Sequence, residues 1–425
     1  MSNWLHDDRK NIWHPFTPLT DENEPLHIES GQGVYLNTPD GRKIIDAISS
    51  WWVNIHGHSN PDIAKAISEQ ATKLEHVIFA GFTHEPAITL SRNLLSVLPE
   101  NQTKLFFSDD GSTSVEVALK MAFQYSYNQS ISKSKVIALK GAYHGDTFGA
   151  MSVGDRSMFT KPFNPFLFDV AFVDFPTVQN ESEVFDQFKT LVDSGDICSF
   201  IFEPLVQGAA GMCMYSASFL DALIEHAQHH DVLCIADEVF TGFGRTGKYF
   251  ASDHLRNKPD IMCLSKGLTG GTLPMGITTC SQKVVAAFET SDFYKTFFHG
   301  HSYTANPLAC AAANASFKLL INSLCQENIK RITAKHGHFK NEIENHKKLK
   351  EVRQTGTILA LELDQGETHY ANDIRKKIYN YFLKQDILLR PLGNVIYILP
   401  PYIITNEELE SVYNAIRKFL DEELK

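Results

Sequence analysis

The chain has 425 residues, of which 43% are hydrophobic and 21% are charged, and its formal net charge is −11. This balance is typical of a globular protein and excludes disordered and fibrous classes, while a length beyond ~250–300 residues favours two domains. The negative charge disfavours nucleic acid and membrane surfaces as partners, and no apolar run reaches the ~18 residues of a membrane span.

The beginning of the chain predicts a β-hairpin. Residues 1–15 have no apolar core behind their charged side chains, so we do not expect a signal peptide. Two short alternating runs, residues 33–38 and 42–47, flank Pro39-Asp40-Gly41, which has the composition of a tight turn. If Trp51 and Trp52 then lie on a strand, they point to opposite faces, and at most one of them meets a ligand.

The middle of the chain predicts an α/β fold. Short apolar runs alternate with longer helical patterns, and strands that are apolar throughout favour a mostly parallel, doubly wound sheet with helices on both faces. The expected strands are residues 104–108, 135–139, 170–173, 199–202, 232–236, 260–264 and 276–280.

The pattern changes near residue 311, where we expect a long amphipathic helix followed by a charged stretch over residues 345–350. Two further strands and two helices are predicted after it, at residues 357–363, 374–383, 395–399 and 406–421. We therefore predict a large domain over residues 55–310 and a smaller α+β domain built from residues 1–54 and 311–425.

The seven cysteines are odd in number, widely spaced and without a CxxC pair. Several lie in apolar runs, as Cys234 does. We expect buried thiols in a reducing cytoplasm rather than disulfides.

Two charged residues close predicted strands, at the sheet edge where open parallel sheets bind ligands. Asp237 follows residues 232–236, and Lys266 follows residues 260–264. A buried ammonium is costly, and a Schiff base with the aldehyde of pyridoxal phosphate (PLP) would neutralise it, with Asp237 as carboxylate partner of the ring nitrogen. The alternative is an ordinary Asp–Lys salt bridge.

A phosphate-binding site is predicted between the strand that ends at Ser108 and the helix after it, because Gly111 and Ser112 lie at the N-terminus of that helix. The alternative is simply a well-capped helix. The next strand leads into a loop in which Tyr143 is suited to stack on a flat ring, and Glu203 supplies a further carboxylate at a strand end.

Two other patterns point to different chemistry and are given little weight. Residues 242–247 match GxGxxG, but the acidic residue that a dinucleotide site needs is misplaced. Asp237 with Glu238 resembles a metal pair, and the histidines at positions 226, 229 and 230 resemble ligands. We expect solvated histidines there and no metal.

Several motifs together resemble class III aminotransferases, and the match covers residues 13–404. They are Phe202-Glu-Pro204, Ala236-Asp-Glu-Val239, Thr241-Gly-Phe-Gly-Arg-Thr-Gly247, Pro259-Asp-Ile261, Leu264-Ser-Lys-Gly267, Gly300-His-Ser302 and Asn306-Pro-Leu-Ala309. The resemblance implies PLP fold type I with PLP as cofactor. By the same resemblance, Lys266 holds the cofactor and moves protons, Asp237 contacts the ring nitrogen, Gly111 and Ser112 bind the phosphate, and Tyr143 stacks on the ring.

Further motifs are similar to a narrower group within that family, the enzymes that convert 8-amino-7-oxononanoate to 7,8-diaminononanoate in biotin biosynthesis with S-adenosylmethionine as amino donor. They include Trp13-His-Pro-Phe-Thr17, Ser49-Ser-Trp-Trp52 and Leu399-Pro-Pro-Tyr-Ile403. This resemblance implies that Trp51 lines the substrate tunnel and that Arg390 meets the substrate carboxylate. Phe16 replaces the usual tyrosine of the first motif, which leaves its stacking but removes a hydroxyl near the donor.

The same resemblance implies a homodimer with shared active sites, in which Gly300, His301 and Ser302 reach the partner's cofactor, with Ser302 in place of the usual threonine. The aromatic segment 297–304 favours an interface on its own account, because a monomer would leave it as an exposed apolar patch. Arg390 lies in the apolar run 388–392, which favours a partly buried guanidinium with an anionic partner over a plain surface arginine.

Alternative functions remain at this point. They are a class III transaminase acting on an ω-amino acid of the 4-aminobutyrate or acetylornithine type, lysine as the amino donor, a PLP-dependent aminomutase, and a non-enzymatic regulator with the same fold.

Overall fold

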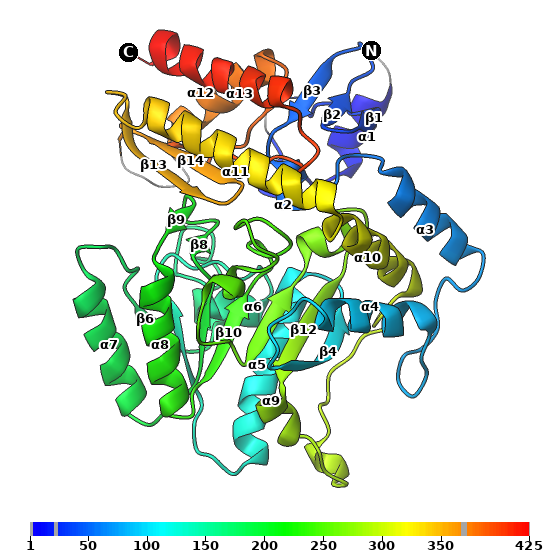
Figure 1. Ribbon diagram of the computed structural model, residues 1–425, viewed down its shortest axis with the longest axis vertical. Coiled ribbons are helices and arrows are strands. Elements are labelled where there is room, and N and C mark those ends of the chain that lie inside the picture. Colours follow the sequence, from blue (N-terminus) through cyan, green and yellow to red (C-terminus); the bar gives the residue numbers. More distant parts are fainter. Residues whose placement is uncertain (1–2, 21–23, 367–371, 425) are drawn as a thin grey trace.

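The apolar runs in the middle of the chain form a seven-stranded sheet in the computed structural model, which describes residues 3–20, 24–366 and 372–424 (Figure 1). Neighbouring strands in this sheet are β4 (Gln102–Ser108), β12 (Gly276–Ser281), β11 (Ile261–Leu264), β10 (Leu233–Asp237), β7 (Ile197–Phe202), β5 (Lys135–Leu139) and β6 (Ala171–Val173). The seven predicted strands and the mostly parallel, doubly wound α/β fold are confirmed. β12 runs antiparallel to both of its neighbours.

Each face of this sheet is covered by its own set of helices. In β5, Ile137 and Leu139 pack in one buried cluster and Val136 and Ala138 in the other, as the alternation of side chains along a strand requires. The first cluster takes in α4 (Glu85–Leu95), α7 (Glu181–Asp193) and α8 (Ala217–His229), and the second takes in α5 (Gly111–Asn128), α6 (Phe148–Val153) and α9 (Gln282–Ala286).

The carboxyl ends of the six strands that run in the same direction, β4, β11, β10, β7, β5 and β6, meet at one edge of the sheet. β4 runs antiparallel to β12, which in turn runs antiparallel to β11, so β4 points the same way as β11, β10, β7 and β5. The loops that follow these strands therefore lie together, and the first residues of β12 join them.

Both chain ends build the upper part of the molecule in Figure 1. A four-stranded sheet contains β1 (Ser30–Gln32), β2 (Tyr35–Asn37), β3 (Lys43–Asp46) and β15 (Ile387–Leu388), and a three-stranded sheet contains β13 (Leu349–Thr355), β14 (Ile358–Leu363) and β16 (Val395–Ile398). The helices of this part are α1 (Asn3–Asn11), α2 (Ser49–Trp52), α11 (Ser323–Ile343), α12 (Ile374–Lys384) and α13 (Asn406–Lys418). The helices α3 (Pro61–Ala71) and α10 (Pro307–Leu320) pack against each other beside the seven-stranded sheet, where α10 also contacts α4. The predicted hairpin is confirmed as β2 and β3. The domain division at residues 55 and 310 stays a prediction.

Three local expectations differ from the structure. The long helix expected after residue 311 is a pair, α10 and α11, bent by 67° where Asn322 caps α11. The strand β13 was not predicted, because Glu351 and Arg353 interrupt its apolar pattern. Trp51 and Trp52 do not lie on a strand but on the short helical turn α2.

Among the described residues, no single helix is long and apolar enough to cross a membrane. The bent pair α10 and α11 meets the criterion of length and composition only when both helices are counted together.

Candidate active site

A cavity of about 400 Å³ lies where the strand ends meet, and five of the predicted site residues line it. They are Gly111, Ser112, Tyr143, Asp237 and Lys266. These residues are separated by up to 155 positions in the chain, and the parallel arrangement of β4, β5, β10 and β11 brings them together. A cavity of this size has the volume of a typical cofactor or ligand pocket.

Asp237, the last residue of β10, is held in place by two donors. Its Oδ1 accepts a hydrogen bond from the backbone N–H of Val239 at 3.1 Å, and its Oδ2 lies 2.7 Å from Nδ1 of His144. Both side chains are buried. The other ring nitrogen of His144, Nε2, is buried without a hydrogen-bond partner in the described chain. The carboxylate is thus fixed in orientation on the cavity wall.

Lys266 lies two residues after the end of β11 and lines the same cavity. Burial lowers the pKa of its amine, and the carboxylates of Asp237 and Glu203 oppose that shift. Its Nζ lies 5.3 Å from the ring centroid of Trp52. Its backbone φ of 42° is unusual for a residue other than glycine, and such strain is concentrated at functional sites. A buried lysine with a lowered pKa is suited to act as a nucleophile and a base.

Glu203, at the end of β7, is also buried on the cavity wall. Its two carboxylate oxygens accept hydrogen bonds from the backbone N–H groups of Tyr143, at 3.1 Å, and Gly208, at 3.0 Å. Burial raises its pKa to about 7, the negative charge of Asp237 acts in the same direction, and His144 opposes it. Glu203 therefore secures the loop that carries Tyr143.

The N-terminus of α5 opens onto the cavity. The side chain of Asp110 caps the helix by accepting from the N–H of Thr113, while Gly111 and Ser112 occupy the first turn, where N–H groups have no acceptor within the helix. The backbone approaches closely here, because a Cβ on Gly145 would lie 2.1 Å from Oγ of Ser112. A helix N-terminus with free N–H groups and a hydroxyl is suited to an anion.

Several residues of this cavity were not predicted as site residues, and His144 and Trp52 are the two with side-chain hydrogen bonds that bear on the site. His144 stands beside the predicted Tyr143, and its position in the same loop was the available signal. Trp52 was grouped with Trp51 as a pair of which at most one meets a ligand. In the structure Trp52 lines the cavity and donates from Nε1 to the hydroxyl of Tyr397 at 3.1 Å.

Phe16, Trp51 and Arg390 form a second group, which we call the Phe16–Trp51–Arg390 cluster. The guanidinium carbon of Arg390 lies 4.5 Å from the ring centroid of Trp51, and the rings of Phe16 and Trp51 are 5.8 Å apart. Phe16 is 51% exposed and Trp51 is 39% exposed. Within the described chain no carboxylate pairs with Arg390, so its charge is available to an anion. None of the three lines the 400 Å³ cavity.

Trp51 and Trp52 face different surroundings because α2 is left-handed. The four residues from Ser49 to Trp52 have φ between 46° and 77°. Asp46, fully buried, holds this turn by accepting from the backbone N–H of Ser50 at 2.9 Å and from its hydroxyl at 2.7 Å.

Gly300, His301 and Ser302 do not line the cavity of their own chain. Nε2 of His301 lies 2.7 Å from the carboxylate of Asp109, next to the residue that caps α5, and Gly300 and Ser302 are exposed. The GxGxxG stretch, residues 242–247, is a loop that no helix follows directly. Its Arg245 is buried and donates to the backbone carbonyls of Trp52 and Pro400, as expected for a structured loop near the site.

Comparison with known proteins gives a consistent picture. The family model described as Aminotransferase class-III matches residues 18–420. The adenosylmethionine-8-amino-7-oxononanoate aminotransferase of Synechococcus elongatus is 47% identical over 97% of this chain and 99% of its own length. The crystal structure of the enzyme of the same name from Methanocaldococcus jannaschii is 35% identical, has a TM-score of 0.92 and covers 98% of each chain. A PLP-bound amine transaminase from an uncultivated Pseudomonas species is 28% identical, with a TM-score of 0.88 over 96% of this chain and 97% of its own.

Proposed function

This chain belongs to the class-III aminotransferase family, and from that premise we propose that it transfers an amino group from S-adenosylmethionine to 8-amino-7-oxononanoate, which yields 7,8-diaminononanoate for biotin biosynthesis. The observation that carries the proposal is the 47% identity, along 97% of the chain, to a relative named for this pair of substrates. The fold is PLP fold type I and the cofactor is PLP.

The residues of the 400 Å³ cavity fit this cofactor. The backbone N–H groups of Gly111 and Ser112 and the hydroxyl of Ser112 are suited to bind the phosphate. The backbone packs closely around them, because neither Gly111 nor Gly145 has room for a Cβ. Asp237 offers a carboxylate to the ring nitrogen, Tyr143 offers an aromatic face, and Lys266 offers an amine of lowered pKa to the aldehyde. When bound, PLP supplies an electron sink that stabilises negative charge on the carbon bonded to the transferred nitrogen.

The chain's own groups then have distinct tasks. Lys266, whose Nζ has a lowered pKa, takes and returns the proton at the reacting carbon. Asp237 keeps its charge directed at the cavity because His144 and Val239 hold it. Glu203 positions Tyr143 through the backbone N–H of that residue.

The Phe16–Trp51–Arg390 cluster provides a place for the substrates. The unpaired charge of Arg390 is suited to the carboxylate of 8-amino-7-oxononanoate, and the exposed face of Trp51 is suited to its apolar chain. Phe16 packs edge-on against Trp51 and Phe159, which leaves the donor an aromatic surface without a phenol hydroxyl.

An assay of amino acceptors tests this function. The purified protein, loaded with pyridoxamine phosphate, is mixed with 8-amino-7-oxononanoate, succinate semialdehyde or N-acetylglutamate semialdehyde, and the amino products are measured by mass spectrometry. We expect turnover with the first acceptor. Preference for either semialdehyde would replace the proposal with an ω-amino acid transaminase. Single turnovers of the PLP form with S-adenosylmethionine and with lysine identify the donor, and conversion by lysine alone would overturn our choice.

The enzyme is also proposed to be a homodimer in which each subunit lends residues 300–302 to its partner's site. The exposed aromatic side chains of the segment before Ala305 support an interface there, because solvent-exposed apolar patches mark contact surfaces. They are Phe293, Tyr294, Phe298 and Tyr303. The phosphate carries about two negative charges, and the hydroxyl of Ser302, which is exposed and does not line the cavity of its own chain, is available to the phosphate site of a second subunit.

Complementation tests the shared site. Inactive Lys266→Ala subunits are mixed with inactive subunits in which Ser302 is replaced by Trp. With shared sites, a heterodimer has one site with both defects and one with neither, so activity returns. If each subunit owned its whole site, the mixture would stay inactive.

We further propose a cytoplasmic location, where the seven cysteines stay reduced. We also propose the division into a large domain of residues 55–310 and a smaller domain built from both chain ends.

A further inference from the structure

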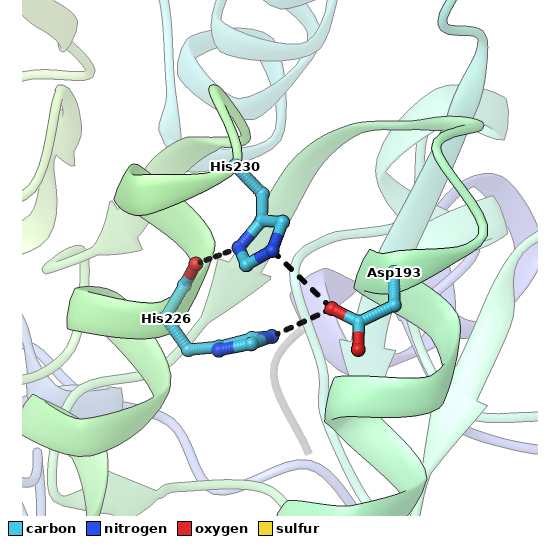
Figure 2. Close-up of side chains that lie close together, drawn as sticks. All are labelled: Asp193, His226 and His230. Atoms are coloured by element: carbon cyan, nitrogen blue, oxygen red, sulfur yellow. Dashed lines mark hydrogen bonds and ion pairs between the residues drawn. The ribbon is translucent and has the colours of Figure 1, made fainter.

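Three side chains that converge on one point lie outside the active site. Asp193 is the last residue of α7, and His226 and His230 are one turn apart at the end of α8 (Figure 2). One ligand atom from each lies within 4.8 Å of the other two. Nε2 of His226 is 3.2 Å and Nε2 of His230 is 3.4 Å from Oδ1 of Asp193.

These distances match the edges of a metal site. In tetrahedral zinc sites, bonds of ~2.0–2.2 Å to nitrogen and oxygen place neighbouring ligand atoms about 3.4 Å apart. Both nitrogen-to-oxygen distances of the cluster are close to that value. The remaining edge, between the two ring nitrogens, is at most 4.8 Å.

The tautomer of His230 favours a cation over a hydrogen bond. Its Nδ1 lies 2.9 Å from the backbone carbonyl of His226, an acceptor, so Nδ1 carries a proton. In the neutral ring, Nε2 then has a lone pair, and this lone pair faces the carboxylate of Asp193. Two acceptors that face each other need a proton or a metal ion between them. A ligating histidine whose other nitrogen donates to a backbone carbonyl is the usual arrangement in metal sites.

The surroundings also favour positive charge. Asp193 and His230 stand at the C-terminal ends of α7 and α8, where the helix dipoles place partial negative charge. Within the part of the chain that the structure describes, no lysine or arginine side chain pairs with Asp193. The ammonium of Lys133 donates to the backbone carbonyls of His230 and Asp231 rather than to the side chains of the cluster.

The cluster is remote from the cofactor cavity. α7 and α8 run back against the strands that they precede, so their C-terminal ends lie at the edge where β7 and β10 begin, opposite to the edge that carries Asp237. Phe185 packs edge-on against His226, with ring centroids 5.9 Å apart, and the two imidazoles lie 4.4 Å apart. An ion there bridges two helices and takes no part in transamination.

We propose that Asp193, His226 and His230 bind one divalent transition-metal ion of the zinc class at the surface of each subunit, and that this ion fastens the end of α7 to the end of α8. The ligand set of two imidazoles and one carboxylate leaves a fourth position open to water. The alternative to this proposal is the expectation from the sequence, that these histidines are solvated and bind no metal.

Titration calorimetry of the PLP-loaded enzyme with zinc chloride alone tests the proposal, after dialysis against a chelator and removal of free cofactor. We expect one ion per subunit. Asp193→Asn and His230→Gln should each weaken binding by at least about tenfold, since even the loss of a group that only supports a ligand costs that much. Zinc should raise the thermal midpoint of the wild type more than that of either variant.

His229→Gln is the matched control, because this exposed histidine lies between the two ligands in sequence and outside the cluster. It should bind zinc as the wild type does. All variants should keep the wild-type transaminase activity, which verifies their folding. A wild type that binds no zinc at millimolar concentration would overturn the proposal. So would equal affinity in the wild type and the Asp193→Asn variant, or a loss of affinity in the His229→Gln variant as large as in His230→Gln.

Discussion

The two ends of the proposed active site are built in different ways. The cavity around Lys266 is lined by residues at strand ends of one sheet, and its ionisable groups are buried and hydrogen-bonded in place. The Phe16–Trp51–Arg390 cluster comes from both ends of the chain, and two of its three members are more than a third exposed. The difference indicates that one chain holds the buried groups around Lys266 in place by itself, whereas the Phe16–Trp51–Arg390 cluster stays open until substrate, or a second subunit, covers it.

Replacement of Lys266 by alanine is the severest way to break the cofactor end. Activity should fall below detection, because the variant loses both the amine for the aldehyde and the base for proton transfer. Borohydride should attach the cofactor to Lys266 in the wild type, as read by mass spectrometry of peptides, and to nothing in the variant. Lys140→Ala, which removes an exposed partner of Asp174, is the control and should stay active. A covalent adduct that survives in Lys266→Ala would refute the assignment.

The substrate end should respond selectively to Arg390→Ala. Loss of an arginine that pairs with a substrate carboxylate costs about 2–5 kcal/mol, so KM for the keto acid should rise by about 30-fold to several thousand-fold, while KM for the donor changes little. Steady-state kinetics with each substrate varied in turn measure both values. Arg256→Ala, at an exposed position, is the control. Equal changes in both KM values would make Arg390 a structural residue.

Glu203 tests whether the ionisable groups of the cofactor end are as buried as the structure indicates, because burial raises the pKa of its carboxyl group from 4.5 to about 7. An acid with a raised pKa in the folded state stabilises the fold fully below pH 4.5 and loses that contribution as the pH rises through 7. In the cofactor-free protein, the free energy of unfolding of Glu203→Gln relative to the wild type should therefore increase by up to about 3 kcal/mol between pH 4.5 and 8. Urea denaturation across this range measures it. The exposed Glu69→Gln should show no such trend, and a flat difference for Glu203→Gln would contradict the buried, protonated carboxyl.

Asp237→Asn should have a smaller effect on activity than Lys266→Ala or Arg390→Ala. The neutral amide weakens a charge-assisted hydrogen bond worth about 1.5–3 kcal/mol, so kcat should fall by about 10- to 150-fold while the cofactor stays bound. Visible absorbance measures the cofactor and initial rates measure kcat. Asp174→Asn, at an exposed ion pair, controls for loss of charge alone. An unchanged kcat would remove Asp237 from the site.

The cofactor end was the predictable one, for a physical reason. Apolar runs mark strands, parallel strands end at one edge, and a charged residue within one or two positions of the end of such a run must lie there, as Asp237 and Lys266 do. Arg390 and Trp51 were placed only by resemblance, since no periodicity shows that α2 and the segment after β15 meet. The antiparallel direction of β12 depends on a loop too irregular to interpret from sequence.

Contacts between side chains that are far apart in the chain could not be predicted from the sequence. His226 and His230 stand four residues apart and suggest a ligand pair, but Asp193 lies 33 residues from His226 and only the packing of α7 against α8 brings it near. His144 likewise meets Asp237 across 93 residues.

The left-handed turn α2 has a consequence for how the protein is made. Its four positive φ values are unfavourable for L-residues, at roughly 1–2 kcal/mol each. Two of the hydrogen bonds that hold it, from Ser49 to the carbonyl of Leu399 and from Trp52 to Tyr397, span 350 and 345 residues. At about 5–20 residues per second, the ribosome delivers those partners roughly 20–70 s after the turn itself has been synthesised. The turn therefore cannot make these two hydrogen bonds until the last strand, β16, has been synthesised, and the substrate end of the enzyme is completed only when translation is nearly finished.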